Sequence, residues 1–207
     1  MLGIVALLLG VTVAMISGVK QRASAARVRA DMSLIAQALE EFRRIHGDYP
    51  RTGDLPQGDP DPARQPLARH HAQAVLFNAL TGVFGATGFA ASDRCNGRSC
   101  LDASRFSLEI PAGRTSALSP NFQIAVPASP GSPPVKCEEL TCLLDPWGGR
   151  YVYYHRGASV GAPWSSGAYV LYSAGPDRRH AAPTLDGALT AYDFAAADNV
   201  DNIYQDR

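Results

Sequence analysis

Charge is missing from the first part of the chain. Met1–Val19 (MLGIVALLLGVTVAMISGV) contains no ionisable side chain, and Lys20 is the first one. An apolar run of this kind is close to the roughly 20 residues that a helix needs to cross a hydrocarbon core, where a helix also satisfies its own backbone polar groups. The sequence therefore predicts a membrane-spanning helix, with a buried soluble helix and a cleaved secretory signal as the alternatives.

A secretory signal is the less favoured of these interpretations. Ala23-Ser24-Ala25 resembles a small-residue cleavage site. However, no basic region precedes the apolar run, and Lys20 and Arg22 interrupt it before that site. The pattern favours a helix that stays attached to the chain.

The chain also lacks an excess of either charge, since 19 basic and 19 acidic residues give a formal net charge of +0. No global field would attract nucleic acid or an anionic surface, so we expect no nucleic-acid partner. The sequence contains no P-loop and gives no expectation of enzymatic activity. With 207 residues, 46% of them hydrophobic, it predicts one compact domain and an appended helix.

Cysteine is scarce. The four cysteines form two C-x4-C pairs, Cys95 with Cys100 and Cys137 with Cys142. They are compatible with two disulfides or with one four-thiolate zinc site, and the compartment decides between these. Outside the cytoplasm we expect disulfides, and local pairing is the preferred one of three connectivities.

Beyond Lys20 the chain is free of proline and glycine until Gly47. Met32, Ile35, Leu39 and Phe42 recur at the spacing of one helical face, and Gly47 and Pro50 end the pattern. The sequence therefore predicts that the anchor continues as an amphipathic helix to His46, about 70 Å long in all.

The remaining elements are shorter. The Pro-, Gly- and Asp-rich segment Arg51–Arg69 predicts a surface loop. The segment that follows, His70–Gly82 (HHAQAVLFNALTG), predicts a second short helix with apolar residues from Ala74 to Leu80 and a stop at Gly82. Segments rich in β-branched and aromatic residues predict an antiparallel pair of strands at Arg150–His155 and Ala168–Ser173. Weaker strands are expected at Phe106–Ile110 and Asn121–Val126.

Three local signatures, in order, carry a family resemblance. They are HGDYP (His46–Pro50), DPWGGRYVYY (Asp145–Tyr154), and LYSAGPD (Leu171–Asp177) with a later DNVDNI (Asp198–Ile203). Together with LFNALTG (Leu76–Gly82) they resemble the major pseudopilins of type II secretion and their bacterial type IV pilin-like relatives, over about half the chain. Residues 85–134 have no counterpart and are interpreted as an insertion.

The resemblance implies an α+β pilin-like fold, with a long N-terminal α-helix packed on a small antiparallel β-sheet. Residues 1–46 would form a transmembrane and amphipathic spine helix, and residues 47–207 a periplasmic globular domain. The chain would then be a single-pass protein of a bacterial inner membrane, in contact with membrane lipid.

The implied function is structural. Subunits would form a homo-oligomer, a helical filament that drives protein export with minor pseudopilins, an inner-membrane assembly platform and an outer-membrane secretin. One alternative is a membrane-tethered extracytoplasmic binding module that does not polymerise and uses residues 85–134. Another is a membrane-bound hydrolase using Ser159 of the G-x-S-x-G match at Gly157–Gly161, but a further strand follows where a nucleophile elbow needs a helix.

The resemblance also implies an N-terminal Phe, an early Glu and a short basic leader that a prepilin peptidase removes. None of these precedes or lies within the apolar run, so we expect Met1 to be an internal residue of a longer reading frame, with a variant lacking these features as the alternative. The basic residues after the run would alone place the C-terminal part in the cytoplasm, and a missing basic leader would remove that contradiction.

A calcium loop is the site that the resemblance implies. Its oxygen ligands would come from the backbone carbonyls of Leu171 and Ser173 and from the side chains of Asp177, Asp198, Asp201 and Asn202. The sequence departs from the family pattern where Arg178 and Arg179 replace the glycine that follows GPD, and where Asn202 replaces a second Asp. Fewer negative charges predict weaker calcium binding.

Overall fold

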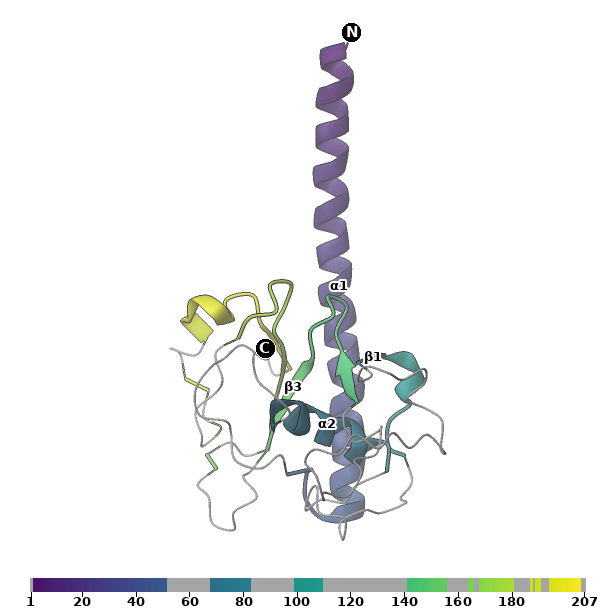
Figure 1. Ribbon diagram of the computed structural model, residues 1–207, viewed down its shortest axis with the longest axis vertical. Coiled ribbons are helices and arrows are strands. Elements are labelled where there is room, and N and C mark those ends of the chain that lie inside the picture. Colours follow the sequence, from purple (N-terminus) through teal and green to yellow (C-terminus); the bar gives the residue numbers. More distant parts are fainter. Residues whose placement is uncertain are drawn as a thin grey trace, which may run out of the picture.

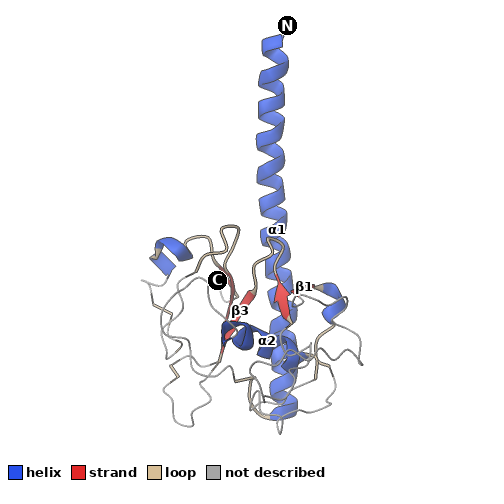
Figure 2. Cartoon of the chain, viewed as in Figure 1, coloured by secondary structure: helices blue, strands red, loops and turns tan. Residues whose placement is uncertain are grey.

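The computed structural model describes the backbone of residues 2–51, 68–82, 99–109, 141–155, 164–165, 168–180, 187, 189–190 and 194–205, and side chains from residues 18 and 73 onward in the first two ranges. The protein is α+β, with a long N-terminal helix, a second helix and small antiparallel sheets (Figures 1 and 2). The elements are α1 (Leu2–His46), α2 (Ala68–Leu80), η2 (Ala103–Arg105), β1 (Ser107–Glu109), β2 (Cys142–Leu144), β3 (Tyr151–Tyr154), β4 (Val170–Ser173), η4 (Ala197–Asn199) and β5 (Ile203–Tyr204).

Helix α1 has 45 residues and is about 68 Å long. Its N-terminal part projects from the globular part, and its C-terminal part crosses the globular part (Figure 1). The predicted stripe is confirmed, because Met32, Ile35, Leu39 and Phe42 are at most 1% exposed. The helix ends at Gly47, whose positive φ of 83° and N–H to the Arg43 carbonyl (2.8 Å) form a left-handed cap.

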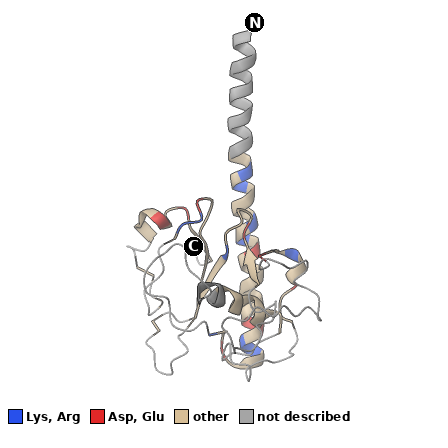
Figure 3. Ribbon diagram, in the orientation of Figure 1, with Lys and Arg blue, Asp and Glu red and all other residues tan. Residues whose placement is uncertain are grey.

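The predicted membrane span lies at the projecting end of α1. Among the described residues, no helix is sufficiently long and apolar to cross a membrane. The side chains of residues 1–17 lie outside the described part, so the span at Met1–Val19 stays a prediction. Where side chains are described, Figure 3 shows basic residues along the part of α1 that leads into the globular part.

Helix α2 contacts α1 on one side and strands β2 and β3 on the other. Leu76, Phe77 and Leu80 are buried, and Gly82 follows the helix with a φ of 82°, which confirms the predicted helix and its stop. The predicted loop is wrong at its last two residues, because α2 already begins at Ala68. The rest of that loop after Arg51 lies outside the described residues.

The predicted strand pair is confirmed, with shorter bounds than expected. β3 and β4 are antiparallel with Tyr151 opposite Ser173, and β5 continues this sheet with Tyr204 opposite Tyr172. Strand β1 lies within the expected Phe106–Ile110 and pairs with β2, while the other weak strand, Asn121–Val126, lies outside the described residues. The two sheets are linked by one bridge, Leu144 to Arg150.

Strands β3 and β4 are buried on both faces. Tyr151, Tyr153 and Leu171 join the core that contains the α1 stripe. Val152 and Tyr172 belong to a second cluster on the opposite face, packed by Trp164, Leu189 and Tyr204. Burial of both faces explains why the segments YVYY and VLYS are almost continuously apolar or aromatic instead of alternating with charges.

Part of the segment interpreted as an insertion contributes to the main core. Leu101, Ala103 and Phe106 are buried in it. The N–H groups of Cys100 and Leu101 donate to the carbonyl of Leu80, at 2.8 and 3.1 Å, and so satisfy the end of α2. The prediction that residues 85–134 are an insertion relative to pseudopilins is not tested by these contacts.

Phe42→Ala tests the stripe. Phe42 is 0% exposed, so the substitution leaves a cavity in the main core and should lower the free energy of unfolding by about 3 to 5 kcal/mol. Gln37→Ala, on an exposed position of the same helix, is the control and should change it by less than about 0.5 kcal/mol. Denaturant unfolding of the full chain in detergent measures both, and equal losses would contradict this packing.

Candidate functional site

Two of the signatures that carry the resemblance meet at Asp145. This side chain is 2% exposed, and its Oδ1 accepts hydrogen bonds from the backbone N–H of Trp147 (2.9 Å) and of Gly149 (2.8 Å). Its Oδ2 accepts a hydrogen bond from the Ser173 hydroxyl at 2.6 Å. Asp145 therefore closes the DPWGG turn and ties that turn to the end of β4.

The pKa of the Asp145 carboxyl is raised, because burial disfavours the charged form more strongly than its surroundings favour it. The Ser173 hydroxyl, the two backbone N–H groups and the positive charge of Arg178 act in the opposite direction. The ionised form of Asp145 is therefore stabilised by these donors. Their hydrogen bonds hold the DPWGG turn against the end of β4.

The loop after β4 approaches Asp201 closely. The Ser173 Oγ also accepts the N–H of Gly175 at 3.2 Å, and Gly175 has a φ of 68°. A Cβ atom at Gly175 would lie only 2.5 Å from the Asp201 carbonyl oxygen and 2.9 Å from its Oδ2. A glycine is required here both by the backbone conformation and by the space available.

The structure brings together two of the predicted calcium ligands, Asp177 and Asp201. The N–H of Asp177 donates to Oδ2 of Asp201 at 3.3 Å, and Oδ1 of Asp177 accepts from the N–H of Arg179 at 2.8 Å. Asp177 is exposed and Asp201 half-buried. Two carboxylates therefore lie at the junction of the GPD loop and the segment that leads into β5.

The other predicted ligands make separate contacts. The Leu171 carbonyl accepts the N–H of Gln205 at 3.2 Å beside β5, and Asp198 lies in η4. Asn202 donates from Nδ2 to Oδ1 of Asn199 at 3.0 Å, whereas its own Oδ1 is buried and has no hydrogen-bond partner. Within the described ranges, no group of three or more His, Cys, Asp or Glu side chains could hold a metal ion.

The predicted disulfides fall partly outside the described residues, which include Cys100 and Cys142 but not Cys95 or Cys137. Cys142 is buried in β2, and this burial raises the pKa of its thiol to about 12. Local pairing stays a prediction. Ser159 of the G-x-S-x-G match also lies outside the described residues.

Trp147 is partly buried against the main core, in keeping with a structural role for the aromatic residue of the DPWGG turn.

The sequence interpretation missed Asp145 as the centre of the site. The sequence did contain an indication of its role, because Asp before Pro and Gly commonly starts a turn by accepting hydrogen bonds from the backbone that follows. The partner Ser173 could not be found in this way, since it is distant along the chain.

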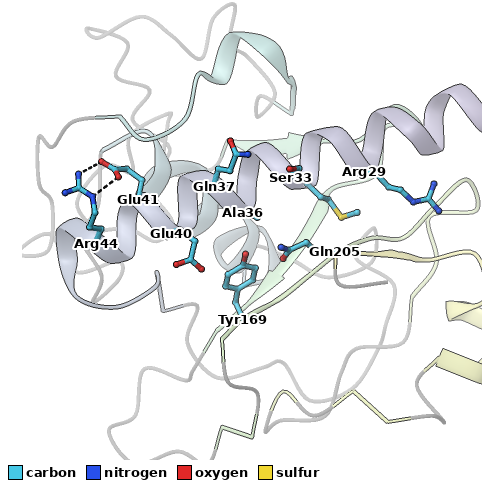
Figure 4. Close-up of a pocket in the computed structure, with 10 residues that line it drawn as sticks. Arg29, Ser33, Ala36, Gln37, Glu40, Glu41, Arg44, Tyr169 and Gln205 are labelled. Atoms are coloured by element: carbon cyan, nitrogen blue, oxygen red, sulfur yellow. Dashed lines mark hydrogen bonds and ion pairs between the residues drawn. The ribbon is translucent and has the colours of Figure 1, made fainter.

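A separate recess lies along the exposed flank of α1, with a volume of about 590 Å³. Figure 4 shows Arg29, Ser33, Gln37 and Glu40 along the helix, with Tyr169 and Gln205 from the strand side. Glu41 and Arg44 are paired with each other at 2.6 Å. Most of the lining residues are polar or charged, with both signs present, while most of the exposed lining surface is apolar.

Comparisons with models of protein families, with curated proteins and with solved structures found no match. The described residues present the Asp145 network and the hydrogen bond from the Asp177 N–H to the Asp201 carboxylate.

The backbone of Arg178 is left-handed, with a φ of 59°. The pseudopilin pattern has glycine at this position. A left-handed backbone costs a side-chain-bearing residue about 1 to 2 kcal/mol, and glycine avoids this cost. Arg178→Gly should thus be more stable than Arg178→Ala by about 1 kcal/mol in thermal or denaturant unfolding. Since both variants lose the same guanidinium, equal stabilities would show that the backbone at this position is not strained.

Proposed function

We propose that this chain is a subunit of a type IV pilin-like filament, of the pseudopilus kind used in type II secretion, which polymerises through its N-terminal helix to drive protein export. The observation that carries the proposal is the division of α1 into two parts with different surroundings. From Val28 to Phe42 one face of the helix is buried in the globular core, whereas residues 18–23 are exposed and the helix projects beyond that core (Figure 1).

The apolar sequence at the projecting end needs a partner. Met1–Val19 carries no charge, and the globular part leaves this end of α1 projecting. Apolar surface of this extent is unfavourable in water, and long helices owe most of their stability to packing of an apolar face. Lipid would cover the segment in a stored subunit, and the helices of neighbouring copies would cover it in a filament.

The α+β architecture supports the same proposal. The C-terminal part of α1, α2 and the sheets form one core, so a subunit would present this core on the outside of a filament while its projecting helix lies at the centre. The residues that carry the pseudopilin resemblance also contact one another through Asp145 and Ser173. A pilin-like fold is the finer interpretation that we propose for this architecture.

The location and partners follow from the proposed role. The subunit would sit in a bacterial inner membrane through a single span, with its globular domain in the periplasm, where the two predicted disulfides would form. Minor pseudopilins, an inner-membrane assembly platform and an outer-membrane secretin are the proposed partners. A cytoplasmic ATPase would supply the work, because this sequence contains no P-loop.

Deletion of Met1–Val19 tests the proposal. The truncated chain should remain folded and monomeric, because the α1 stripe that builds the core begins at Val28, whereas the full chain should form filaments in membranes that contain the secretion machinery. Circular dichroism checks the fold, and electron microscopy with sedimentation checks assembly. Full-length chains that stay monomeric and bind a ligand through the globular domain would instead favour a membrane-tethered binding module.

We also propose that calcium binds between the GPD loop and the segment before β5. The backbone of Asp177 contacts the Asp201 carboxylate, and the buried Oδ1 of Asn202 has no hydrogen-bond partner, so these residues offer the hard oxygen donors that calcium requires. Asp198 and the carbonyls of Leu171 and Ser173 complete the proposed set. Bound calcium would hold the C-terminal segment against β4 and thereby stiffen the outer surface of the subunit.

Calcium should raise the thermal midpoint of the wild-type chain, and a concentration 100-fold above the dissociation constant should add about 2.7 kcal/mol of stability. Asp177→Asn should reduce this gain by removing a charged ligand. Asp102→Asn, on the exposed cap of η2, is the matched control and should keep it. Calorimetric titration that gives no heat, together with no stabilisation by calcium over magnesium, would contradict the calcium proposal without affecting the filament proposal.

A further inference from the structure

His155 lies directly after β3 and is 3% exposed. Its Nδ1 lies 2.7 Å from the carbonyl oxygen of Ala168, and its Nε2 lies 3.2 Å from Oδ1 of Asp48. The ring thereby connects three segments, namely the turn after α1, the end of β3 and the segment before β4. Neither the proposed packing of the projecting helix nor the proposed calcium site uses this contact.

Both partners of the imidazole are hydrogen-bond acceptors. A backbone carbonyl cannot donate, and the Ala168 carbonyl already accepts the indole N–H of Trp164 at 3.0 Å. Asp48 accepts from the N–H of Tyr49 at 2.9 Å and from Arg51 at 3.2 Å. Only the imidazolium form has an N–H group on each ring nitrogen, so only this form satisfies both contacts.

Asp48 is held in its charged form. Partial burial alone would raise its pKa, but the hydrogen bond from the Tyr49 N–H and the contact with His155 outweigh burial, so the pKa is lowered. A carboxylate that stays ionised remains an acceptor, and it cannot donate a proton to a neutral imidazole. The charge on Asp48 therefore favours the charged state of His155.

We propose that His155 is a pH-sensitive clasp that joins the turn after α1, the end of β3 and the segment before β4 when its ring is protonated, and that gives up one of these contacts when the ring is neutral. Among the residues that the structure describes, the titratable and charged groups near the ring include Asp48, Arg51 beyond it, and Tyr49, whose ring meets the imidazole edge-on at 5.3 Å. From the other side the ring contacts Trp164, at 5.8 Å between centroids.

Loss of the proton breaks one of the two contacts. A neutral imidazole carries one N–H and one lone pair, and the lone pair must face either the Ala168 carbonyl or the Asp48 carboxylate. Trp164 is packed against Gly187, where a Cβ atom would lie 2.4 Å from the indole ring. Loss of either contact therefore weakens the link that the ring makes between these segments.

The direction of the pH dependence follows from the state that the fold prefers. Because the folded protein favours the charged ring, the stabilisation is fully present below about pH 6.5, where an exposed histidine titrates. It is lost as the pH rises through the range in which folded His155 gives up its proton. The free energy of unfolding should thus fall towards alkaline pH. A paired carboxylate has the opposite effect, because its contribution is lost towards acid pH.

The test uses the full chain in detergent with labelled histidine rings, followed by NMR from about pH 5 to pH 9. His155→Gln assigns the His155 signals. At pH 7 the wild-type ring should carry protons on both nitrogens, whereas His46 at the half-buried end of α1 serves as the internal comparison. A His155 ring that is already neutral at pH 6 would overturn the proposal.

Asp48→Asn is the decisive variant, since its amide N–H can donate to the lone pair of a neutral imidazole and the side chain keeps its size. The fall in unfolding midpoint between about pH 6 and pH 9 should largely disappear in this variant and persist in the control His46→Gln. If Asp48→Asn retains the pH profile of the wild type, the contact is structural and no switch exists. Because the variant is nearly isosteric, the test remains valid even if His155→Gln does not fold.

Discussion

Burial of one face of α1 is the interaction on which the rest of the structure depends. The stripe from Val28 to Phe42 is covered by α2 and by the β3–β5 sheet, whose tyrosines fill the space between helix and strands. Each of the strands is short, and α2 has only 13 residues. Such elements are marginal alone and are stabilised by packing on a shared core, which makes the helix both the organiser of the globular part and the element that leaves it.

Buried polar contacts then fix the ends of the short strands. Asp145 receives hydrogen bonds from its own turn and from Ser173, and Gly175 allows the following loop to approach Asp201. At the opposite end of the β3–β4 pair, His155 ties the turn after α1 to the segment before β4. These contacts set the positions of loops that the hydrophobic core alone would leave undefined, and the proposed calcium site and the proposed His155 clasp lie at them.

Much of this architecture is readable from the sequence because local rules determine it. The spacing of Met32, Ile35, Leu39 and Phe42 predicts the buried face of α1, Gly47 and Gly82 predict the helix ends, and dense aromatic segments predict β3 and β4. Strands β2 and β5 were missed, because they have only three and two residues and are defined by their partners. No local pattern of two residues distinguishes such a strand from a loop.

The candidate site was harder to predict from the sequence, because its contacts join residues that are distant along the chain. The resemblance selects Asp177 and Asp201, and the fold brings these two together. It does not reveal that Asp145 holds the loop through Ser173, 28 positions away, or that Arg178 occupies a left-handed conformation. Likewise, the partners of His155 lie on segments distant in sequence, so its two acceptors become evident only in three dimensions.

The central claim is that the projecting part of α1 packs against other copies of the same helix. A photoreactive residue at Val19, which is 65% exposed on α1, tests this most directly in membranes that contain the secretion machinery, with Val200, 72% exposed on the globular part, as the comparison. The account predicts a ladder of covalent homo-oligomers through position 19 that disappears when assembly is blocked. Adducts at position 19 to lipid alone, with every chain remaining a monomer, would contradict it.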